Sequence, residues 1–77
     1  MTLEEFKRAR SVLSGVIGNT GLVHSDAFST ATGNQVYLKP ENMQVTGAYK
    51  IRGAYYKIST LSREQKERGL VTASAGN

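Results

Sequence analysis

The chain has 77 residues, of which 39% are apolar and 21% charged, a globular composition without an apolar run long enough to span a membrane. It has no cysteine and a single histidine, His24, which excludes a disulfide framework and leaves no set of metal ligands. The net charge of +4 comes from ten basic residues spread along the chain without a cluster, so we expect a soluble, cytoplasmic protein with neither a nucleic-acid nor a membrane partner.

The first predicted element is an amphipathic helix from residue 2 to about residue 17. Thr2 and Glu5 match a capping box, and Gly18 with Asn19 would end the helix. Its apolar residues recur at helical spacing, at Leu3, Phe6, Ala9, Val12, Leu13, Val16 and Ile17.

Residues 20–34 mix short apolar pieces with Gly, Ser, Thr and Asp. We expect a short extended piece, one helical turn near residues 26–30, and a turn at Gly33 and Asn34. His24 is interpreted as a loop or interface histidine, because no carboxylate partner is identified near it in sequence.

Residues 35–39, QVYLK, read as a strand that Pro40 stops, followed by a connecting loop. Thr46 is the predicted N-cap of a helix over residues 48–61.

A second capping box, Ser62 with Gln65, opens a short charged helix that Gly69 would end. Residues 70–74, LVTAS, are predicted to be a strand buried in a sheet. Helices that alternate with strands predict an α/β architecture with a mainly parallel sheet. Because the chain stops directly after this strand, we expect it to be the N-terminal portion of a longer protein.

Lys50 falls in the first turn of the predicted helix. Unpaired N–H groups and the positive end of the helix dipole disfavour an ammonium there by a few tenths to about 1 kcal/mol, and Arg52 would add positive charge if its side chain turned back. A neutral lysine can form a Schiff base with a carbonyl or accept a proton. An ordinary surface lysine is the alternative on this local pattern alone.

Residues 41–54, ENMQVTGAYKIRGA, resemble the cofactor-lysine segment of the pyridoxal-phosphate enzymes of the tryptophan-synthase-β fold type. VYLKPENMQ before this segment and TASAGN after it fit the same family in order and spacing. Within the family the chain most resembles the threonine dehydratases (threonine ammonia-lyases) and the related serine racemases. The resemblance implies an N-terminal fragment of a two-domain α/β enzyme of fold type II with mainly parallel sheets. Residues 1–61 would belong to the large domain, and residues 62–77 would begin the small one.

The resemblance also implies roles for individual residues. Lys50 would hold pyridoxal 5'-phosphate as a Schiff base and shuttle the substrate α-proton, and Tyr49 would lie against the pyridine ring. Asn77 would hydrogen-bond the phenolic oxygen of the cofactor. The loop that receives the substrate carboxylate would consist of Ser74, Ala75, Gly76 and Asn77. Glu41 and Lys39 either brace the lysine segment or belong to a solvated turn.

The implied function is a lyase of amino-acid metabolism, as in isoleucine biosynthesis, which converts threonine or serine to a 2-oxo acid and ammonia. The full-length enzyme would be a homodimer or homotetramer. Ala75 stands where serine racemases carry a serine, which favours dehydration over racemisation. The 77 residues alone are expected to be inactive, because the glycine-rich phosphate cradle of the family lies beyond them.

Two other classes of function stay open. Serine racemase, threonine synthase or another β-replacement enzyme would share the fold type and the lysine. A small basic binding module without chemistry would show salt-dependent nucleic-acid binding and no chromophore.

Overall fold

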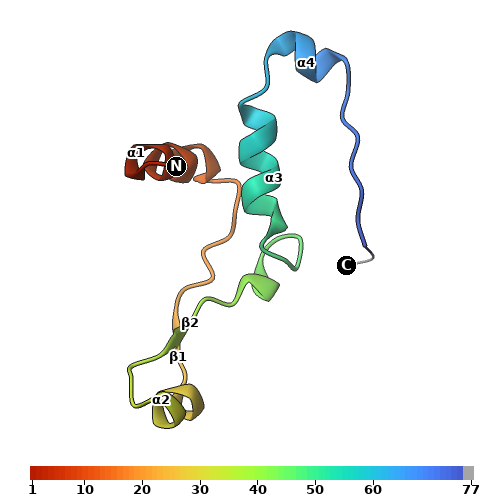
Figure 1. Ribbon diagram of the computed structural model, residues 1–77. Helices are drawn as coiled ribbons and strands as arrows, with labels where there is room; N and C mark the ends of the chain where they lie inside the picture. The colour runs from red at the N-terminus through yellow and green to blue at the C-terminus, as the bar shows by residue number, and fades with distance from the viewer. Residues whose placement is uncertain (76–77) are drawn as a thin grey trace.

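The computed structural model describes residues 1–75, so the predicted site residues Gly76 and Asn77 lie outside the described residues. In chain order its elements are α1 (Leu3–Leu13), β1 (Val23–His24), α2 (Asp26–Thr32), β2 (Tyr37–Leu38), the 3₁₀ helix η1 (Glu41–Met43), α3 (Lys50–Ser59) and α4 (Arg63–Glu67). Helix α1 packs against α3, and the segment that holds β1, α2 and β2 projects away from these two helices as an arm (Figure 1).

Helix α1 begins as the sequence predicts and ends earlier. Thr2 Oγ1 accepts the Glu5 N–H at 3.3 Å, and Glu5 Oε2 accepts the Thr2 N–H at 2.6 Å, which confirms the capping box. The helix ends at Leu13, and Gly15 has a φ of 81°. Glycine adopts this left-handed conformation without a Cβ clash, so Gly15 breaks the helix before Gly18 is reached.

The arm contains a two-stranded antiparallel sheet in which Val23 pairs with Leu38 and His24 with Tyr37. The predicted strand at residues 35–39 is therefore present but shorter, and the predicted helical turn is α2, which is capped by Ser25 Oγ and ended by Gly33 at a φ of 71°. Within residues 1–75 the sheet is antiparallel, so the predicted mainly parallel sheet is not found in this part of the chain.

The predicted strand at residues 70–74 is absent from the described structure. The segment is extended but irregular, and it runs from α4 back in the direction of the N-terminal end of α3 (Figure 1). An apolar run becomes a strand only when a neighbouring strand takes up its backbone N–H and C=O groups. No neighbouring strand is present for it within residues 1–75, and the prediction fails for that reason.

Helix α3 begins at Lys50 after Tyr49, which makes no side-chain capping bond. The predicted N-cap Thr46 is wrong, because its hydroxyl donates to the Ala48 carbonyl at 3.3 Å instead. For α4 the prediction is confirmed: Gln65 N–H donates to Ser62 Oγ at 3.2 Å, and Gln65 Oε1 accepts the Ser62 N–H at 2.9 Å.

Little of the described chain is buried. Leu13 is the one buried apolar residue among residues 1–75, at 6% exposure, and Gln44 is the one buried polar residue, at 4%. The Cα radius of gyration is 16.3 Å, against about 11 Å for a compact domain of this length. These residues are held together by local caps and by a few specific polar contacts more than by a shared core.

Candidate functional site

Lys50 is the first residue of α3, and its side chain is exposed to solvent. Tyr49 precedes it and exposes 66% of its surface. The first turn of α3 has no acidic residue and no side-chain cap. The amine therefore stands at an open, positively polarised helix end without a carboxylate in the same turn.

The loop before α3 is fixed to the helix by a two-point ion pair. Arg52 Nε donates to Glu41 Oε2 at 3.0 Å, and Arg52 Nη2 donates to Glu41 Oε1 at 2.7 Å. The side chains are 36% and 18% exposed, so the pair is partly shielded from water. Glu41 is thus a brace of the lysine segment and not part of a solvated turn.

This ion pair also decides where the charge of Arg52 acts. The hydrogen bonds from Arg52 lower the pKa of the Glu41 carboxyl below its ordinary value of 4.5, against the opposing effect of partial burial. In return, Glu41 raises the pKa of the Arg52 guanidinium. The charge of Arg52 is offset by a carboxylate, so it does not act on Lys50 as an uncompensated cation.

The same loop is fastened a second time by Gln44. Its amide nitrogen donates to the Gly18 carbonyl at 2.7 Å, and its amide oxygen accepts the Gly18 N–H at 3.0 Å. Between Gln44 and α3 the chain makes a tight turn in which Gly47, at a φ of 72°, donates its N–H to the Gln44 carbonyl at 2.8 Å. A residue with a Cβ would be strained at Gly47.

Ser74 and Ala75, the predicted carboxylate-binding residues, lie in the exposed irregular segment after α4. The structure does not place them at the start of a helix. It brings Tyr49 and Lys50 together as sequence neighbours, and neither of the two grooves described next includes any of these four residues.

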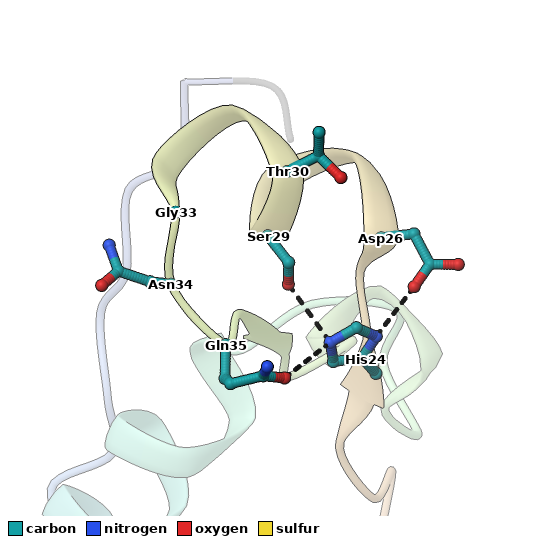
Figure 2. A pocket seen from close by; sticks show the side chains of 7 residues that line it. All are labelled: His24, Asp26, Ser29, Thr30, Gly33, Asn34 and Gln35. Carbon is teal, nitrogen blue, oxygen red and sulfur yellow. Dashed lines mark hydrogen bonds and ion pairs between the residues drawn. The ribbon is translucent and has the colours of Figure 1, made fainter.

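One groove, of about 760 Å³, lies between α1 and α3. Its apolar lining comes from Phe6, Ala9, Leu13, Ile17 and Tyr56. The other groove, of about 470 Å³, lies on the arm around His24 and is open to solvent (Figure 2).

The His24 cluster on the arm was not predicted from the sequence. His24 Nδ1 lies 3.1 Å from Asp26 Oδ1, and Nε2 lies 3.2 Å from both Ser29 Oγ and Gln35 Oε1 (Figure 2). The interpretation that His24 lacks a nearby carboxylate is therefore wrong. The spacing of Asp two residues and Ser five residues after the histidine was a usable signal, because the turn into α2 brings all three together.

The contacts of Asp26 with His24 and of His24 with Ser29 resemble those of a catalytic triad, but their surroundings indicate a structural role. Ser29 Oγ already accepts the Val36 N–H at 2.9 Å, and the Asp26 side chain is 99% exposed. A triad needs a buried orienting carboxylate and a hydroxyl free to attack. The cluster instead ties α2 to the strands of the arm.

Within residues 1–75 we find no group of three side chains placed to bind a metal ion. None of the helices in that part of the chain has the length and apolar character needed to cross a membrane.

Comparison with known proteins adds the family. The sequence profile of the family described as pyridoxal-phosphate dependent enzymes matches residues 13–77. The chain belongs to this pyridoxal-phosphate-dependent enzyme family. No solved structure matches it.

Its relatives in this pyridoxal-phosphate-dependent family include enzymes named for threonine. The chain is 52% identical over 77 residues to the L-threonine ammonia-lyase of Thermotoga maritima. It is 42% identical over 77 residues to the catabolic L-threonine dehydratase TdcB of Escherichia coli strain K12, and 44% identical over 78 residues to that of Staphylococcus aureus strain USA300. Each match covers 100% of this chain but only 19%, 23% and 22% of the respective relative. The chain thus spans about a fifth of the length of these relatives.

The residues at the start of α3 fit the cofactor of the pyridoxal-phosphate-dependent family. A primary amine is the group that condenses with an aldehyde, and the Lys50 amine is exposed at the start of the helix. The neighbouring Tyr49 offers an exposed aromatic ring. An exposed primary amine and an exposed aromatic neighbour, which an aldehyde cofactor with an aromatic ring could use, are therefore both present in the described residues.

Proposed function

We propose that the complete protein is a pyridoxal-phosphate-dependent ammonia-lyase that converts threonine, or serine, to a 2-oxo acid and ammonia. The observation that carries the proposal is the exposed amine of Lys50 at the uncapped start of α3, in a chain whose 77 residues align throughout with enzymes named L-threonine ammonia-lyase and L-threonine dehydratase. The lysine, the chemistry of an aldehyde cofactor and the names of the relatives all support the same reaction class.

Lys50 is the proposed catalytic residue. Its Nζ would hold the cofactor aldehyde until the substrate amine displaces it, and it would then, as a free amine, accept the proton from the substrate Cα. Pyridoxal phosphate would supply an electron sink for the negative charge that develops at that carbon. Tyr49 would contact one face of the cofactor ring and limit its movement, which keeps the substrate Cα–H bond in the orientation that the electron sink requires.

The second part of the proposed site is the loop of Ser74, Ala75, Gly76 and Asn77. The backbone N–H groups of this loop would bind the substrate carboxylate, and the Asn77 side chain would donate to the phenolic oxygen of the cofactor. Ala75 leaves no hydroxyl at the position where racemases have one, which supports dehydration over racemisation.

We further propose the architecture in which this chemistry takes place. Residues 1–61 belong to a large domain and residues 62–77 begin a small one, in a cytoplasmic two-domain enzyme with mainly parallel sheets that forms a homodimer or homotetramer. Closure of the cleft between the domains would bring the loop at residues 74–77 to Lys50 and exclude water. The substrate is a free amino acid, and no nucleic-acid or membrane partner is proposed.

The deciding experiment uses the full-length protein with pyridoxal phosphate. Reduction with borohydride should leave a stable adduct on Lys50, and threonine should give 2-oxobutanoate while serine gives pyruvate. An adduct on another side chain, or none, would refute the role of Lys50. An intact adduct with D-serine or a β-replaced amino acid as the main product would keep the fold type and overturn the lyase.

A further inference from the structure

We propose that Glu41 and Arg52 form a positioning pair that fixes the rotation of the first turn of α3 and thereby the direction in which Lys50 Nζ points. The inference rests on the proposed function of Lys50. It adds two residues that act through Lys50 without touching cofactor or substrate.

The geometry of the contact is what makes it a positioning device. A single hydrogen bond lets both side chains swivel, whereas a guanidinium that donates from Nε and Nη2 to the two oxygens of one carboxylate is fixed in its plane. Arg52 makes this two-point contact with Glu41, at 3.0 and 2.7 Å, and both side chains are partly buried. Glu41 itself is the first residue of η1, so the backbone that carries the carboxylate lies in regular structure.

The helix carries the constraint from Arg52 to Lys50. Successive residues of an α-helix are rotated by about 100°, so these two side chains leave the axis about 200° apart. Holding Arg52 against η1 therefore directs Lys50 to the opposite side of the helix, away from the loop. The start of α3 needs such a restraint, because Tyr49 provides no side-chain cap and uncapped helix ends fray.

The fork and the charge can be separated by substitution. Arg52→Lys keeps the cation but replaces the planar fork with a single rotatable ammonium. Glu41→Gln keeps the shape but leaves the charge of Arg52 uncompensated two residues from Lys50. The double exchange Glu41→Arg with Arg52→Glu restores a two-point pair with its polarity reversed.

The chain offers a matched control. Arg63 and Glu67 form an ion pair of the same residue types on α4, but through one contact of 3.1 Å and with side chains 93% and 66% exposed. Arg63→Lys and Glu67→Gln therefore repeat both substitutions where no catalytic group depends on them.

The test measures steady-state kinetics of the full-length holoenzyme and amide hydrogen exchange of residues 48–53 in the full-length apoenzyme. For Arg52→Lys we expect kcat to fall by about ten- to a hundredfold with little change in KM, because a displaced Nζ impairs the reaction more than binding. Exchange at residues 48–53 should rise by about tenfold, with the rest of the protein unchanged. The double exchange should recover part of both losses, and the α4 controls should leave both values unchanged.

Three results would overturn the proposal: equal effects of Arg52→Lys and Arg63→Lys, exchange that rises evenly over the whole protein, or no recovery in the double exchange. The proposed function fails separately, by a borohydride adduct that is absent from Lys50 of the wild-type enzyme. The exchange measurement needs no cofactor, so it tests the restraint on α3 in either case.

Discussion

Lys50 and Lys57 lie on the same helix, but only Lys50 stands at its uncapped end. In the full-length enzyme, Lys50→Ala should abolish the absorbance band of the bound cofactor and lower the rate by about 10³-fold or more, because both the attachment point and the proton acceptor are lost. Lys57→Ala, in the last turn of α3, should leave both unchanged. A normal band in Lys50→Ala would contradict the assignment.

Glu41 makes the start of α3 sensitive to acid. A carboxyl whose pKa is lowered in the folded state adds stability that is fully present above its unfolded pKa and is lost as the pH falls through the folded value. Since Arg52 lowers the pKa of Glu41 from 4.5, the contribution of this carboxylate to the stability of α3 should be present above pH 4.5 and be lost as the pH falls below that value. Hydrogen exchange of residues 48–53, corrected for the intrinsic pH dependence, should show this decline in the wild type and not in Glu41→Gln.

At the scale of the elements, two of the three positions that the sequence marks as helix caps, Ser62 and Thr46, should differ in the effect of their substitution. Ser62→Ala removes a capping box that the structure contains, so the amides of α4 should lose about 1 kcal/mol of protection, or about fivefold in exchange rate. Thr46→Ala removes a predicted cap that the structure lacks, and exchange at the start of α3 should change little. Equal effects at the two sites would contradict the observed caps.

The two hydrogen bonds of Gln44 with Gly18 should make its side chain important for stability. Gln44→Ala would leave the Gly18 N–H and carbonyl without their partners, at a cost of about 1–3 kcal/mol. Gln35→Ala, which removes one exposed contact with His24, is the matched control and should cost less. Thermal melting of the two full-length variants under the same conditions makes the comparison.

The sequence predicted an element correctly where the interactions that fix it join residues close together in the chain. The capping boxes at Thr2 and Ser62 join residues three apart and were predicted correctly. The contacts of Gln44 with Gly18 and of Glu41 with Arg52 join residues 26 and 11 apart. No local pattern identifies such partners. The predicted strand at residues 70–74 failed for a related reason, since a strand is defined by a neighbour that the sequence of the strand does not name.

The candidate site divides in the same way. Lys50 and Tyr49 could be found from a local motif, and the structure places the lysine at a helix start as the motif indicates. Its brace by Glu41 was left open against a solvated turn, because the choice depends on where Arg52 points. The His24 cluster was missed although the spacing of His24, Asp26 and Ser29 is local, and only its contact with Gln35 depends on how the arm folds.

For the molecule as a whole, the small buried fraction predicts the behaviour of the 77 residues in isolation. With Leu13 as the one buried apolar side chain of residues 1–75, burial cannot offset the conformational entropy of ordering the chain. We expect the isolated polypeptide to show partial helicity by circular dichroism that declines gradually on heating. A sharp, cooperative melt would contradict this expectation.

The Gln44 contact with Gly18 also shapes the chain on a larger scale. These two hydrogen bonds join the chain segments on either side of the arm formed by β1, α2 and β2, so the two ends of the arm are held together. A surface segment whose two ends are held together can be replaced by one of a different length without moving the residues outside it. Replacing residues 23–38 with a short glycine-rich hairpin, which keeps Glu41 and Gln44, should therefore leave the approach of α1 to α3 unaltered and makes the arm a place for an engineered tag.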